Sequence, residues 1–156
     1  MANAEVIELW VEALESGEYP QTTGALHRVR KGPCGEPVGY CCLGVLTHLA
    51  AKRGVVDVIR VDEDGEVIYG DDEDYSSTSL PQAVREWAGL NSADPLVEYE
   101  LTAAEVEDEY DHLLREEWED LFADDTTLAA LNDERGRTFP EIAQIIRDNF
   151  LSSKTA

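Results

Sequence analysis

The stretch GYCCLGVLTHLAAKRG, residues 39–54, predicts a short apolar helix that starts near Cys41 and ends at Gly54. Neighbouring side chains on a helix point about 100° apart, so we expect only one of Cys41 and Cys42 to lie deep in the core. The apolar face of this helix is formed by Leu43, Leu46, Leu49 and Ala50. The other predicted elements are arranged around this helix. Its two thiols are either reactive groups or part of the core.

A helix N-terminus lowers the pKa of a nearby thiol, which would favour a reactive Cys41 or Cys42. The partners of such chemistry are missing, because there is no C-x-x-C pair and His48 lies on a different helix face from Cys42. Cysteine is also among the most often buried residue types. We therefore predict that the thiols pack in the core, and that the protein uses no cofactor and no metal.

A zinc or thiol site is the alternative interpretation of this region. Its ligands would come from Cys34, Cys41, Cys42 and His48, with His27 close in the sequence. Their spacing contains no C-x2-C pair, and Cys34 is expected in a turn.

A calcium loop at residues 62–66 is a further alternative, but an EF-hand register would place arginine at the first ligand position, where aspartate is required. Only unspecific binding of divalent cations to this acidic loop remains.

Helical signals flank the opening stretch on both sides. Residues 3–16 predict a first helix with an asparagine cap and an apolar face. Ser79 and Gln82 predict a capping box at the start of a further helix, and Thr138 and Glu141 predict another at the start of the last helix. A short helix is expected at residues 126–131.

Strand signals are fewer and shorter. Residues 25–30 and 38–40 predict a hairpin, and a second hairpin is expected around the Asp64-Gly65 turn. A short strand is expected at residues 96–99. We predict an α+β fold, mainly helical with about five helices and one or two small antiparallel β-hairpins, in a single compact domain.

The domain boundaries follow from composition. Residues 1–151 are expected to form one globular domain, and residues 152–156 a disordered tail. Residues 102–125 keep an i, i+4, i+7 apolar rhythm, which predicts an acidic amphipathic helix that is a possible insertion. No run of about 20 apolar residues is present, no signal peptide is evident, and three cysteines favour a reducing cytoplasm.

Charge is the most unusual property of the sequence. The chain has 34 acidic and 12 basic residues, a formal net charge of −22. Residues 57–74 hold nine acidic residues and one basic residue, and residues 102–125 hold eleven acidic residues and one basic residue. About four-fifths of the excess negative charge therefore lies in two short blocks.

Three interpretations of this clustering stay open: solubility, adaptation to high salt, and a patch that engages a basic protein or imitates a phosphate backbone towards a DNA-binding protein. The same field would repel nucleic acid, so we expect no direct nucleic-acid partner. We also expect no membrane partner, because the sequence has no long apolar run. The predicted patch comprises Asp62, Asp64, Asp71, Asp72, Asp74, Glu105, Asp108, Glu109, Glu116, Glu119 and Asp120.

The segment LNDERGRTF, residues 131–139, is the other candidate for binding. It is either a helix stop followed by a helix cap, or a polar loop directed into a cleft beside the start of the cysteine helix. In the second interpretation, a small nucleotide ligand would contact Tyr40, Asn132, Asp133, Arg135 and Arg137.

Four segments carry a resemblance to a known family: ELWVEALESGEYPQTTGALH, GYCCLGVLTHLA, LPQAVREWAGL and LAALNDERGRTFPEIAQIIRDNF. Their layout resembles small proteins of tailed-phage and actinobacterial genomes, which pair a C-L-G-V-L helix with a terminal L-N-D…G…F-x-E-I-A segment. The resemblance implies a phage or mobile-element origin and a compact α+β domain, with no catalytic residues to carry over.

Without a catalytic triad, a phosphate-binding loop or a metalloprotease motif, nothing in the sequence indicates an enzyme. The sequence predicts a non-enzymatic phage-type accessory protein in the cytoplasm of an infected host. Its acidic surface would engage a basic host protein and counter a host factor or an antiviral defence system. Sequestration of a nucleotide immune signal in a pocket is the second hypothesis, and a zinc or thiol site is the third.

Overall fold

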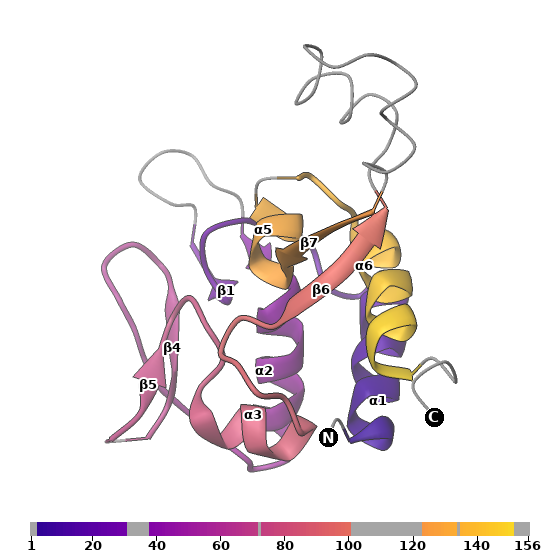
Figure 1. Cartoon of the computed structure of the whole chain (residues 1–156). Coiled ribbons are helices and arrows are strands. Elements are labelled where there is room, and N and C mark those ends of the chain that lie inside the picture. Colours follow the sequence, from indigo (N-terminus) through magenta and orange to yellow (C-terminus); the bar gives the residue numbers. More distant parts are fainter. Residues whose placement is uncertain (1–2, 31–37, 72, 101–122, 134, 152–156) are drawn as a thin grey trace.

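Helix α2 (Cys42–Lys52) lies at the centre of the computed structural model, which describes residues 3–30, 38–71, 73–100, 123–133 and 135–151 (Figure 1). Six consecutive residues at its start, residues 42–47, are buried. A helix that is apolar all round needs neighbours on every side. Most buried apolar side chains of the described residues accordingly form one hydrophobic cluster that includes those of α2.

Gly44 allows the backbone of the preceding segment to cross α2 in direct contact. A Cβ atom added at Gly44 would lie 1.5 Å from the carbonyl oxygen of Leu26. Only glycine fits such an approach of two backbones. The glycine of the C-C-L-G-V-L motif therefore sets how α2 packs.

Both thiols are buried, so the expectation that only one of them lies deep in the core is wrong. Cys41 is the extended N-cap residue of α2 and not a helical residue, which removes the 100° separation. Its Sγ accepts a hydrogen bond from the amide of Gly44 at 3.3 Å, and the Sγ of Cys42 donates to the carbonyl oxygen of Leu128 at 3.4 Å. Cys41 is 4% exposed and Cys42 is fully buried.

Helices α1 (Ala4–Glu15) and α6 (Phe139–Ile146) pack against each other beside α2 (Figure 1). Trp10 fixes α1 to α2, because its Nε1 donates to the carbonyl oxygen of Cys42 at 2.8 Å. The Thr138 capping box at the start of α6 is confirmed, and α6 continues into a wider π-type turn, η2 (Arg147–Leu151). The first and last helices therefore close one side of the core.

The strands of the described residues form three small antiparallel sheets. The first sheet pairs β1 (His27–Arg28) with β2 (Gly39–Tyr40), and the third pairs β6 (Leu96–Glu100) with β7 (Ala123–Thr127). The second sheet has the order β3 (Asp57–Val61), β4 (Val67–Gly70), β5 (Tyr75–Ser76). Both predicted hairpins and the strand near residues 96–99 are confirmed.

Several boundaries differ from the sequence predictions. Residues 123–127 form β7, so the expected helix at 102–125 is wrong at its end; the rest of it, and the expected tail at 152–156, lie outside the described residues. The helix expected at 126–131 starts later, as α5 (Leu128–Asp133). Pairing with β6 holds residues 123–127 in a strand, which overrides the helical pattern.

Helix α3 (Gln82–Ala88) also starts later than expected, because the Ser79 capping box does not form. The hydroxyl of Ser79 lies 3.2 Å from the hydroxyl of Ser76 instead. The first free amide of α3, that of Gln82, donates to a carboxylate oxygen of Asp74, eight residues earlier. The cap of α3 therefore comes from the loop before β5.

The fold is α+β, with five α-helices and small antiparallel sheets of two or three strands among the described residues, as predicted. Within the same residues, no helix combines the length and apolar character required to cross a membrane.

Candidate functional site

The first acidic block lies in the second sheet, which we call the acidic hairpin and define as residues 57–71 and 73–76; β3 is exposed, whereas β4 is buried. It comprises β3, β4, β5 and their connections. Four residues of the predicted patch lie here: Asp62, Asp64, Asp71 and Asp74. The other seven lie outside the described residues: Asp72, Glu105, Asp108, Glu109, Glu116, Glu119 and Asp120.

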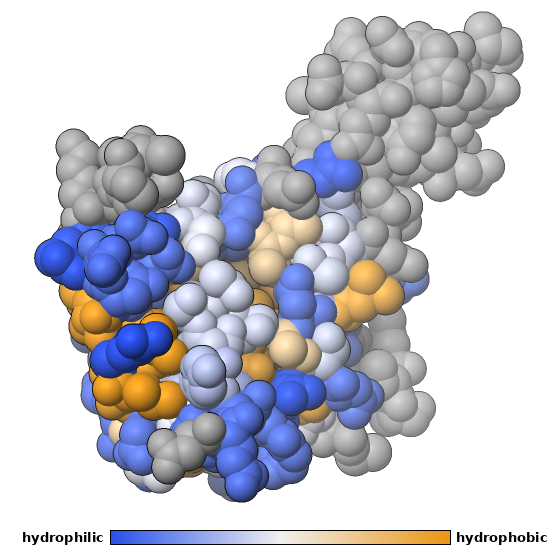
Figure 2. All heavy atoms as spheres, turned by 90° about the vertical axis from the view of Figure 1, so that its left-hand side faces the viewer, coloured by the Kyte–Doolittle hydropathy of each residue, from blue (hydrophilic) through white to orange (hydrophobic). Residues whose placement is uncertain are grey.

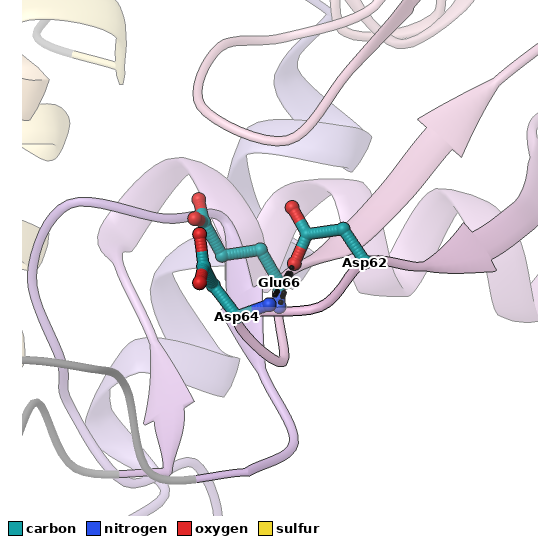
Figure 3. Close-up of side chains that lie close together, drawn as sticks. All are labelled: Asp62, Asp64 and Glu66. Carbon is teal, nitrogen blue, oxygen red and sulfur yellow. Dashed lines mark hydrogen bonds between the residues drawn. The ribbon is translucent and has the colours of Figure 1, made fainter.

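The tip of the acidic hairpin brings three carboxylates together (Figure 3). One oxygen each from Asp62, Asp64 and Glu66 lies within 4.8 Å of the others, and no second group of this kind occurs in the described part of the chain. Asp62 Oδ1 also accepts the amides of Asp64 at 2.9 Å and Glu66 at 3.0 Å, so this side chain shapes the turn. Three carboxylates hold six oxygens, and Asp62 Oδ1 already accepts two amides, so they do not by themselves fill the six to eight ligand positions of Ca²⁺.

Two arginines hold the same turn from the β1 side. Arg28, 4% exposed, donates from Nη1 to the carbonyl oxygen of Asp64 at 3.3 Å. Arg30 donates from Nη2 to the carbonyl oxygen of Asp62 at 2.6 Å. Both guanidinium groups therefore donate to backbone oxygens of the turn. Their positive charge lowers the local affinity for a metal cation.

The base of the acidic hairpin is a second turn, from Asp71 to Asp74. Asp71 Oδ1 accepts the amides of Glu73 and Asp74, both at 2.8 Å. The hydrogen bond from the Asp74 amide, followed by that from Glu73, lowers the pKa of the Asp71 carboxyl. The carboxylate of Asp74 accepts the first amide of α3, so backbone amides hold both side chains of this turn.

Apolar side chains interrupt the acids on this surface. Val58 is 54% exposed, Ile59 and Val61 are each 42% exposed, and Tyr75 is 60% exposed. A shallow hollow of about 230 Å³ lies between β3 and β5, lined by Ile59, Arg60, Ile68, Asp71 and Tyr75. Figure 2 views this side of the molecule and shows hydrophobic residues gathered between strongly hydrophilic ones. Such a mixture is typical of a protein-binding surface.

The predicted loop site at residues 132–137 has a different geometry from the expected cleft. Asn132 and Arg137 line an open groove of about 310 Å³ together with residues 21–23 and Gly136. The ring of Tyr40 does not line this groove, although its backbone pairs with Gln21. Asp133 is exposed, and Arg135 is partly buried outside the groove lining.

The polar groups of this groove are used within the protein. Asn132 accepts from Gln21 Nε2 at 2.8 Å, and its own amide donates to the Thr22 carbonyl at 2.8 Å and to Asp133 Oδ1 at 2.7 Å. The guanidinium of Arg137 lies 5.4 Å from the centre of the Tyr99 ring, in cation–π contact. This network ties the loop after α1 to α5, which favours the structural interpretation of the segment.

A cluster of histidine and tyrosine rings lies between the β1–β2 pair, β4 and α2. The sequence did not predict it. The ring of His27 stacks on Tyr40 with centroids 4.0 Å apart, and His27 Nδ1 lies 3.0 Å from the Tyr69 hydroxyl. His48 lies 5.2 Å from Tyr40, and Tyr19 packs edge-on against the same ring. The signal available in the sequence was the β1–β2 hairpin itself, whose register pairs His27 with Tyr40.

Burial suppresses the charge of this ring cluster. It lowers the pKa of His27 to about 4, with a smaller contribution from His48, and it also lowers the pKa of His48. Burial raises the pKa of the Tyr40 hydroxyl. The imidazoles are therefore neutral at pH 7.

The thiols are equally inactive. Burial raises the pKa of Cys41 to about 12 and places that of Cys42 well above its usual range. Cys42 faces α5, whereas His48 faces the ring cluster, so Cys41, Cys42 and His48 do not converge on one metal position. Cys34, the fourth candidate ligand, lies outside the described residues.

Fold and site together define a small α+β domain that carries the acidic hairpin on a helical core. The chain belongs to the family described as Domain of unknown function (DUF8296), whose model matches residues 2–150. No curated protein and no solved structure matches the chain.

Proposed function

We propose that this protein is a non-catalytic binding protein, which uses the acidic hairpin to engage a basic surface on a partner protein. The observation that supports this proposal is the combination of exposed carboxylates with exposed Val58, Ile59 and Tyr75 on one hairpin. The carboxylates would select a basic partner and raise the association rate, while the apolar side chains would be buried on binding. A basic DNA-binding protein is one such partner.

The resemblance to phage proteins supports a biological setting for this proposal. In that setting the partner is a host factor or a component of an antiviral defence system in the cytoplasm of the infected cell. The protein would act by occupying the basic surface of that component. Inhibition of this kind requires that the protein binds its partner tightly and is present in sufficient amount. It requires no chemical reaction.

A charge-matched pair of variants tests the proposal. Glu63→Gln, Asp64→Asn and Glu73→Gln together remove three charges from exposed positions of the acidic hairpin. Glu5→Gln, Glu8→Gln and Glu12→Gln remove three charges from the exposed face of α1, as the control. A photo-crosslinker placed at Glu63 in host cells identifies the protein that contacts the hairpin, and its affinity is then measured with both triple variants.

We expect the hairpin triple variant to bind this partner about tenfold more weakly at low salt, since exposed ion pairs contribute about 0.2–1 kcal/mol each. The α1 triple variant should bind within about twofold of wild type, and wild-type binding should weaken steeply between about 50 and 200 mM NaCl. Equal losses in the two triple variants would show a non-specific charge effect and contradict the proposal.

A further inference from the structure

β3 is an open edge of its sheet. In the order β3-β4-β5, its only neighbour among the described residues is β4, and all five of its residues are exposed. β4, by contrast, is buried along its whole length. The hairpin therefore covers the core with β4 and extends β3 beyond it, where one row of backbone groups faces outwards.

The register of the hairpin shows which backbone groups face the open edge. The amide of Asp62 donates to the carbonyl oxygen of Glu66 at 2.9 Å, so this pair is a hydrogen-bonded one. Pairs alternate along an antiparallel ladder, and the next pair, Val61 with Val67, is therefore not hydrogen-bonded. The amide and carbonyl of Val61 consequently point away from β4, towards the open edge.

The side chains and charges around the open edge of β3 indicate which kind of strand could pair with it. Val58, Ile59 and Val61 offer apolar contacts along the strand. Acidic residues stand at both of its ends, with Asp57 at the start and residues 62–64 after it. A second copy of β3 would bring like charges together at every end, which is unfavourable. An incoming strand with lysine or arginine between apolar residues would match both features.

We infer that β3 receives an extended segment of the partner protein as an additional strand, and that this segment alternates apolar and Lys or Arg residues. This inference rests on the proposed function and adds its binding mode. Backbone hydrogen bonds to the edge, including those of Val61, supply affinity, while the acidic residues at the strand ends select the basic sequence. The bulge between Val58 and Arg60 limits how far the added strand can extend along the edge.

The probe for this inference is a fluorescein-labelled peptide of ten residues that alternates lysine with valine and threonine. Its binding to the full chain is measured by fluorescence anisotropy. Two control peptides are used: one with the same composition but with lysines and apolar residues in separate blocks, and one N-methylated at alternate amides. The second control removes donors from the peptide and leaves the protein unchanged.

Two substitutions at one position test the role of the backbone. Val61→Pro removes the outward amide without removing a β3–β4 hydrogen bond, and Val61→Thr keeps the amide and the strand preference. We expect Val61→Pro to weaken binding of the alternating peptide about tenfold, and Val61→Thr to stay within about threefold of wild type. Leu96→Thr, at a 64% exposed apolar position of another sheet, should have no effect.

The outcomes separate the inference from the proposed function. Equal binding by Val61→Pro and Val61→Thr, or equal binding of the N-methylated and unmodified peptides, would overturn strand addition. In that case the hairpin triple variant still reports whether the acidic surface binds a basic partner. Absence of alternating-peptide binding at about 1 mM, the range of weak affinities, would overturn the inference, as would a dimer that pairs β3 with β3.

Discussion

Gly44 shows how one missing side chain positions the central helix. In a helix interior, replacing glycine with alanine normally stabilises by about 1 kcal/mol. Here the added methyl group would overlap the backbone of Leu26. We expect Gly44→Ala to lower the free energy of unfolding by at least about 3 kcal/mol in urea denaturation.

Gly54→Ala is the control for this experiment, since nothing lies within 4 Å of its added Cβ and only its positive φ of 75° opposes the change. It should cost about 1–2 kcal/mol. A Gly44→Ala protein as stable as wild type would show that the β1 segment does not cross α2 in direct contact.

The lowered pKa of His27 predicts that the free energy of unfolding depends on pH. This pKa is about 4 in the folded state, below the value of about 6.5 expected in the unfolded chain. Between these values the unfolded state binds more protons, so stability is fully present above pH 6.5 and falls as the pH drops towards 4. The loss is at most about 3 kcal/mol, and it is reduced by solvent screening because the ring is only partly buried.

Urea titrations of wild type and His27→Gln at pH 7.5 and pH 4.5 would measure this effect. Glutamine keeps a polar group near the Tyr69 hydroxyl but does not titrate. We expect a smaller drop in stability for the variant, with the remaining drop including the contribution of His48. Identical pH profiles for the two proteins would contradict the assignment.

At the scale of elements, the cap of α3 comes from a residue that lies eight positions before the helix and outside its first turn. The carboxylate of Asp74 accepts the amide of Gln82, whereas the hydroxyl of Ser79 lies 3.2 Å from the hydroxyl of Ser76. We expect Asp74→Ala to cost about 1 kcal/mol and Ser79→Ala to cost less. Asp74→Asn keeps an acceptor oxygen and should fall between wild type and Asp74→Ala in thermal denaturation.

If Ser79→Ala lowered the stability more than Asp74→Ala, the result would contradict the Asp74 cap and support the Ser79 capping box expected from the sequence. Comparison with Thr138→Ala calibrates the experiment, because Thr138 caps α6 from within its own helix start. That variant should also cost about 1 kcal/mol.

The elements that could be predicted from sequence are those fixed by neighbouring residues. The Thr138 box, the apolar pattern of α2 and the Asp64-Gly65 turn each depend on contacts within a few positions. β5 and β7 were missed because a strand of two residues, or one that follows a helical pattern, exists through its partner strand. The histidine–tyrosine cluster was missed for the same reason, since it joins β1, β4 and α2.

At the scale of the whole molecule, a net charge of −22 predicts that salt stabilises the fold. Repulsion between like charges acts over about 30 Å at 0.01 M ionic strength and about 3 Å at 1 M. We expect the Tm to rise by roughly 5 °C between these conditions in NaCl, which corresponds to about 1–2 kcal/mol for a chain of this size. Differential scanning calorimetry measures it directly.

The hairpin and α1 triple variants serve here as controls, because each removes three negative charges and changes the formal net charge from −22 to −19. Both should show a smaller rise of the Tm with salt than wild type. A Tm that is flat or falls with NaCl would mean that the acids are not mutually destabilising at low salt.

The pairing of β6 with β7 has a practical consequence for engineering. Its register sets Glu100 opposite Ala123, so these two residues lie about 5 Å apart although 22 residues separate them in the sequence. An Asn-Gly linker between them would complete a tight reverse turn. The resulting shortened chain, lacking nine acidic residues and one basic residue of the second block, should keep its melting cooperativity. The same two residues then form an attachment position where a fluorescent or affinity module can be grafted.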